Sequence, residues 1–156
     1  MSNVSVLTAK AFRAELPKQV RTHLPAEWHN FKHRSHFSLV QFWYDEPAFH
    51  FEVWPQRKRG LIEVGLHLEH REAGRNAALH RFFDRHFLEI RHELGAIWLE
   101  KWDRGWHKLY KTFPFARYNE ALLKTVSQEA ARQIVVLQPF LREALEKSPP
   151  SPGGRA

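Results

Sequence analysis

Residues 49–68 read FHFEVWPQRKRGLIEVGLHL, in which apolar and polar residues alternate on both sides of a basic turn. A period of two with Phe, Val and Leu in the apolar positions predicts strands that are each buried on one face. The short turn contains Pro and Gly, so the two strands should form an antiparallel hairpin. If they pair symmetrically about this turn, Glu52 lies near Glu63. We expect this hairpin to be the centre of the fold.

The residues before the hairpin predict one helix and one further strand. Apolar residues recur every four positions over 8–24, which is typical of an amphipathic helix. Pro17 should either kink this helix or begin a second one. Residues 26–36 are expected to be a short helix or a loop. The β-branched and aromatic residues of 38–44 predict a strand.

The residues after the hairpin predict two helices and two strands. A stripe of Leu and Phe precedes Gly95, so a single helix should end at this glycine. Two strands are expected over 96–102 and 106–113. Asn119 can cap a long final helix, which Pro139 should kink or split.

Together these elements predict an α+β fold. We expect a mostly antiparallel sheet of about five strands, built from a meander and a hairpin, with helices packed on one face. Residues 1–147 should form a single domain. Residues 148–156 form a tail rich in Pro, Gly and Ser, for which we predict disorder.

The composition limits the class of protein. The formal net charge of +7 at pH 7 favours acidic partners, either nucleic acid or an acidic protein. The chain has no cysteine, which leaves neither disulfides nor thiolate metal sites. The longest aliphatic run, Ile134–Leu137, is far too short to cross a bilayer, so no membrane association is expected. We predict a cytoplasmic protein.

The face of the sheet away from the helices has an unusual composition. If the apolar residues of the hairpin point at the helices, the alternate residues must point the other way. The residues expected on this second face are aromatic, acidic and basic: His50, Glu52, Trp54, Glu63, His67, Glu69, Trp98, Glu100, Trp102, Trp106, Lys108 and Tyr110.

Three interpretations of this face compete. In the first, another layer covers its aromatic rings, either a helix of the same chain or a second copy in a structural homodimer. In the second, the face is a binding groove where rings stack on bases and the basic turn holds phosphates. The residues of that groove would be Trp54, Trp98, Trp102, Arg57, Lys58 and Arg59.

The third interpretation is a metal-assisted hydrolase. Neighbouring carboxylates can raise each other's pKa or hold a divalent ion, and a histidine can act as a base. The candidate catalytic residues are Glu52, Glu63, His50 and His67. The common nucleophile and phosphate-loop motifs are absent from the sequence, so we lean away from an enzyme and assign no metal site and no cofactor.

Residues 49–146 also carry the pattern of a known family. The matching features are IEVGLHLE at 62–69, Asn76 before Leu79 and Phe83, Ile90 before Leu94-Gly95, Trp98-Leu99-Glu100, and the closing amphipathic helix. In these features the chain resembles an uncharacterised bacterial α+β domain family that occurs alone or fused to nuclease-like domains. The resemblance implies an accessory or nucleic-acid-associated module, and it supplies no catalytic residues. From the residues and the resemblance together we expect a binding or accessory module that contacts nucleic acid or a protein partner.

Overall fold

The computed structural model describes residues 5–147, and the predicted disordered tail lies outside them. The described chain contains four helices and six strands. In chain order they are α1 (Ala9–Thr22), β1 (Lys32–His36), β2 (Leu39–Trp43), β3 (Phe49–Gln56), β4 (Leu61–Leu68), α2 (Ala73–Arg85), α3 (Phe87–Leu94), β5 (Trp98–Lys101), β6 (His107–Pro114) and α4 (Glu120–Lys147). The predicted α+β class is confirmed.

The strands form one antiparallel sheet in the order β1-β2-β3-β4-β6-β5. The predicted hairpin of β3 and β4 lies at its centre. Its register places Glu52 opposite Gly65 and Trp54 opposite Glu63, two residues away from symmetric pairing about the predicted turn. The reason is that β3 continues to Gln56, so the turn is shorter and closes at Gly60 with a φ of 63°. A shift of two keeps every side chain on its predicted face.

The sixth strand, β1, occupies the segment for which a helix or loop is predicted. It lies at the edge of the sheet, and all of its residues are exposed, so both of its faces contact water. An edge strand of this kind has no buried face to impose an apolar period of two on the sequence. β1 pairs with β2 from Lys32 opposite Trp43 to His36 opposite Leu39.

The helices differ from the predictions in where they break. The predicted helix before Gly95 is two helices, α2 and α3, which meet at His86. In contrast, α1 continues through Pro17 and α4 through Pro139, each as one helix. The predicted cap of α4 is confirmed, because the backbone N–H of Leu122 donates to Asn119 Oδ1 at 2.7 Å.

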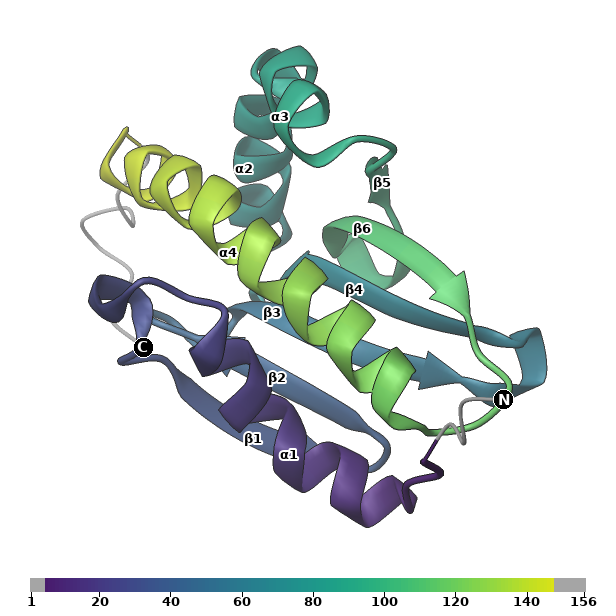
Figure 1. The fold of residues 1–156 in the computed structure, drawn as a ribbon. Coiled ribbons are helices and arrows are strands. Elements are labelled where there is room, and N and C mark those ends of the chain that lie inside the picture. Colours follow the sequence, from purple (N-terminus) through teal and green to yellow (C-terminus); the bar gives the residue numbers. More distant parts are fainter. Residues whose placement is uncertain (1–4, 148–156) are drawn as a thin grey trace.

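Helices α1 and α4 lie across the same face of the sheet, as Figure 1 shows, which we call the helix face. The main core lies between them and the sheet. Its fully buried side chains include Phe12, Leu16, Phe42, Phe51, Ile62, Leu66 and Leu109. The opposite side of the sheet is called the outer face below.

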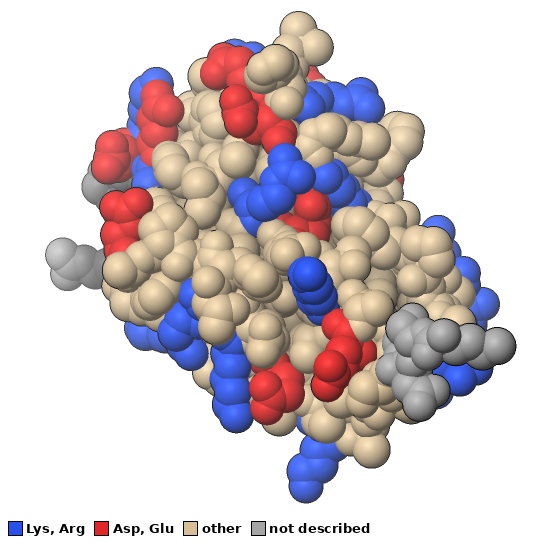
Figure 2. Space-filling model, viewed as in Figure 1, with Lys and Arg blue, Asp and Glu red and all other residues tan. Residues whose placement is uncertain are grey.

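Charge is spread over the helix side of the molecule. In Figure 2, which has the view of Figure 1, Lys and Arg side chains alternate with Asp and Glu side chains and uncharged surface. No helix within residues 5–147 has the length and apolar character needed to cross a membrane.

Candidate functional site

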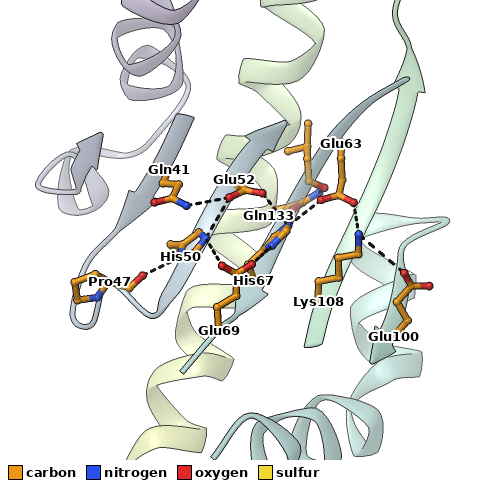
Figure 3. A network of polar contacts seen from close by, with 11 residues as sticks. Gln41, Pro47, His50, Glu52, Glu63, His67, Glu69, Glu100, Lys108 and Gln133 are labelled. Carbon is orange, nitrogen blue, oxygen red and sulfur yellow. Dashed lines mark hydrogen bonds and ion pairs between the residues drawn. The ribbon is translucent and has the colours of Figure 1, made fainter. Parts of the chain in front are cut away.

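The outer face carries a buried group of ionisable side chains. The antiparallel register places His50 of β3 directly opposite His67 of β4. Figure 3 shows the two imidazoles side by side with carboxylates around them. We call His50, Glu52, Glu63, His67 and Glu69 the His/Glu cluster. His50 is 2%, Glu52 4%, Glu63 1% and His67 0% exposed.

His67 lies between two carboxylates. Its Nδ1 is 2.7 Å from Glu69 Oε2, and its Nε2 is 2.8 Å from Glu63 Oε2. Burial alone would lower the pKa of His67, but the hydrogen bonds to Glu63 and Glu69 and the charge of Glu52 outweigh burial and raise this pKa to about 10. In the cluster as it stands, His67 is therefore an imidazolium that donates from both nitrogens.

Glu52 joins the two histidines. Its Oε1 lies 3.3 Å from His50 Nε2, and its Oε2 lies 3.4 Å from His67 Nε2. The side-chain amide of Gln41 donates to Oε1 at 3.0 Å. Burial raises the pKa of Glu52, but the contact with His50, the charge of His67 and the bond from Gln41 together lower it to about 2. The carboxylate is consequently ionised.

Lys108 closes the cluster on the side of β6. Its Nζ donates to Glu63 Oε1 at 2.6 Å and lies 4.0 Å from Glu100. The same ammonium is 4.9 Å from the ring centroid of Trp102 and 5.8 Å from that of Trp54. Aromatic faces stabilise such a cation while they exclude water. Lys108 thus links the buried carboxylates to the aromatic surface.

A pocket of about 630 Å³ opens beside Lys108, where the outer face meets the turn between β3 and β4. We call it the Trp/Arg pocket. Its lining residues are Ser38, Trp54, Pro55, Gln56, Arg57, Lys58, Arg59, Glu100, Trp102, Lys108 and Tyr118. Five of the six predicted binding residues therefore line one pocket. Trp98 does not line it, and 58% of this residue is exposed.

The aromatic rings of the outer face pack on one another. The centroid of Trp102 lies 6.2 Å from that of Trp54, 5.5 Å from that of Trp106 and 5.8 Å from that of His67. Trp54 and Trp102 remain partly exposed. Trp102 thus packs directly on His67 of the cluster, while Trp54 and Trp102 also border the pocket.

The four predicted catalytic residues, Glu52, Glu63, His50 and His67, are brought together, but inside the protein rather than on an open surface. The sequence also predicts Glu69 and Lys108 on this face without giving them a role in the site. The repeated pattern His-x-Glu, at 50–52 and again at 67–69, is a signal that could have found Glu69.

No protein-family model, no curated protein and no solved structure matches the chain. The resemblance over residues 49–146 stays a prediction.

Proposed function

We propose that this protein binds single-stranded nucleic acid in the Trp/Arg pocket. The observation that carries the proposal is that two tryptophan rings and three consecutive cations line one pocket. Nonspecific binders of single strands combine aromatic platforms for unpaired bases with cations that follow the backbone. Both parts come here from the central hairpin and from Trp102 after β5.

The cations of the turn are free to contact phosphates. Arg57, Lys58 and Arg59 are exposed, and no carboxylate within residues 5–147 lies within ion-pair distance of them. Arg57 packs over the ring of Tyr118 at 5.5 Å, and Arg59 donates to Gln56 at 3.0 Å. These contacts orient the guanidinium groups without neutralising them, so their charge is directed at solvent.

The carboxylates of the outer face weaken this pocket less than their number in the sequence suggests. Glu52 and Glu63 are buried and paired with His67 and Lys108. Paired buried charges project little field into solvent. Among the lining residues, Glu100 is the one carboxylate, and 47% of its side chain is exposed. Three free cations therefore face one acidic side chain.

The same burial makes the hydrolase interpretation less favourable. A substrate must come within hydrogen-bond reach of a general base, but the candidate acids and bases are buried, and the Trp102 ring packs against His67. The homodimer interpretation depends on an apolar patch. The exposed ring of Trp98 instead has a cation beside it, because the guanidinium carbon of Arg91 lies 6.0 Å from the ring centroid. Binding in the pocket is the function that needs no movement of the fold.

The test is fluorescence anisotropy with a fluorescein-labelled oligothymidylate, repeated over a series of salt concentrations. The triple variant Arg57→Ala, Lys58→Ala, Arg59→Ala should bind more weakly than the wild type. It should also lower the slope of log affinity against log salt by about 2, since each phosphate contact on a single strand contributes about 0.7.

The matched control removes three other exposed cations, Lys10, Arg71 and Lys124, and therefore has the same net charge as the test variant. It should keep most of the affinity of the wild type. Equal losses in the two triple variants would mean that binding follows net charge alone, and a wild type that binds no oligonucleotide would refute the proposal.

A further inference from the structure

The two histidines of the His/Glu cluster are held in the same manner. The Nδ1–H of His50 donates to the carbonyl oxygen of Pro47 at 2.8 Å, and the Nδ1–H of His67 donates to Glu69 Oε2 at 2.7 Å. The His50 ring is thereby fixed with Nε2 toward Glu52, and the His67 ring with Nε2 between Glu63 at 2.8 Å and Glu52 at 3.4 Å. In metal sites, a hydrogen bond from the distal ring nitrogen to a carbonyl or carboxylate oxygen performs this orientation.

The spacing of the three donor groups fits one metal ion. His50 Nε2 and His67 Nε2 lie 3.3 Å and 3.4 Å from the two oxygens of Glu52. One ligand atom from each of His50, Glu52 and His67 can be chosen so that all lie within 4.8 Å of one another. Two ligands 2.0–2.1 Å from a tetrahedral ion are about 3.3–3.4 Å apart, and the separation of each imidazole nitrogen from its nearer Glu52 oxygen has this length, one oxygen for each histidine.

A buried nitrogen in this group has no hydrogen-bond partner. His50 Nε2 is enclosed by protein, and its nearest polar neighbours are Glu52 Oε1 at 3.3 Å and Glu69 Oε1 at 3.7 Å. His50 is 98% buried, because 2% of its surface is exposed. A buried polar atom without a partner is costly, and a ligated metal ion would satisfy it.

We infer that His50, Glu52 and His67 form a binding site for a divalent first-row transition metal such as Zn²⁺. Two imidazoles and one carboxylate favour Zn²⁺ or Fe²⁺ over Mg²⁺ and Ca²⁺, which prefer oxygen ligands. Glu69 is then a positioning residue that holds the His67 ring. The site lies next to the Trp/Arg pocket but needs no nucleic acid, so it can be tested separately from the proposed function.

The experiment uses the full chain without an affinity tag, stripped with a chelator and dialysed against Zn²⁺ with metal content measured by mass spectrometry. The wild type should bind one equivalent of Zn²⁺, and Mg²⁺ in excess should not displace it. Co²⁺, used as a spectroscopic probe, should give the visible ligand-field absorption of a site with fewer than six ligands. Glu69→Gln should weaken Zn²⁺ binding by about 10–100-fold, as loss of a supporting carboxylate does elsewhere.

His50→Gln and Glu52→Gln should abolish stoichiometric binding, with circular dichroism confirming that each variant is folded. The matched control is His80→Gln, which removes a histidine from the other contacting pair and should retain one equivalent. A wild type that binds neither Zn²⁺ nor Co²⁺ would overturn the inference without the need for a variant. Zn²⁺ binding that survives His50→Gln but is lost in His80→Gln would also overturn it.

Discussion

The His/Glu cluster and the Trp/Arg pocket lie on the same sheet face, but their charged side chains differ in burial and in pairing. In the cluster every charged group is paired inside the protein, as Glu63 is with Lys108 at 2.6 Å. In the pocket Arg57, Lys58 and Arg59 remain exposed at the turn. The comparison teaches that ionisable residues of one hairpin pair with one another where neighbouring side chains bury them and stay exposed where the strands end at the turn.

The largest expected effect comes from breaking the buried pair. Lys108→Met leaves Glu63 buried beside His67 alone, and removal of one partner of such a pair costs about 3–5 kcal/mol. Urea denaturation should show this decrease in the free energy of unfolding. Lys147→Met is the matched control, because its pair with Glu143 has a similar length of 2.8 Å but is exposed on α4. The control should change stability by less than about 0.5 kcal/mol. Equal effects would contradict the distinction between buried and exposed charge.

Gly65→Ala should have the next largest effect. Gly65 lies opposite Glu52, and a Cβ there would be 2.5 Å from the carbonyl oxygen of Leu109 and 2.6 Å from Tyr110 Cβ. Overpacking of this kind costs about 1–3 kcal/mol, and the nearest atoms are backbone or close to it, so they cannot easily move away. Gly74→Ala, which meets no atom within 4 Å, is the control. A stable Gly65→Ala protein, measured by urea denaturation, would show that β4 and β6 are less tightly packed than described.

A smaller effect concerns the stability of the protein in acid. It comes from a pair of histidines whose ring nitrogens contact each other rather than a carboxylate. The Nδ1 atoms of His80 and His107 are 2.7 Å apart, so one donates and the other accepts. Burial, then the charges of His80 and Lys101, lower the pKa of His107 to about 4. The unfolded chain therefore binds more protons below pH 6.5, and stability present above pH 6.5 is lost as the pH falls through about 4.

His107→Gln should reduce this loss, measured as the difference in urea midpoint between neutral and acidic pH. His33→Gln, an exposed histidine of β1, should leave the difference unchanged. If both variants keep the full acid sensitivity of the wild type, the pair does not control it. His67 lies at the opposite extreme, because its carboxylate neighbours raise its pKa.

The predictable part of the fold is the part with a one-sided apolar pattern. The central hairpin has this pattern and was assigned to the correct faces, even though its register was wrong by two. β1 has no buried face, so its sequence carries no period of two. The break between α2 and α3 is at His86, where the sequence has no Gly or Pro that would predict it.

The alternation of side chains along each strand was enough to predict which residues of the site share the outer face. It was not enough to predict that they are buried. Alternation placed His50 and Glu52 on the outer face of β3. It could not show that the Trp102 ring, just after β5, packs against His67, because that contact depends on β6 pairing with β4 and placing β5 at the edge. The same pairing decides which tryptophans line the pocket and leaves Trp98 outside it.

Trp54 and Trp98 allow the most direct test of nucleic-acid binding in the pocket, since both lie on the outer face and only Trp54 lines the pocket. The measurement is the oligothymidylate affinity of Trp54→Leu and Trp98→Leu by anisotropy at one salt concentration. Loss of a stacked base costs about 1–3 kcal/mol, so Trp54→Leu should weaken binding markedly while Trp98→Leu binds like the wild type. Equal affinities for the two variants, whether both are weakened or neither is, would contradict binding in this pocket.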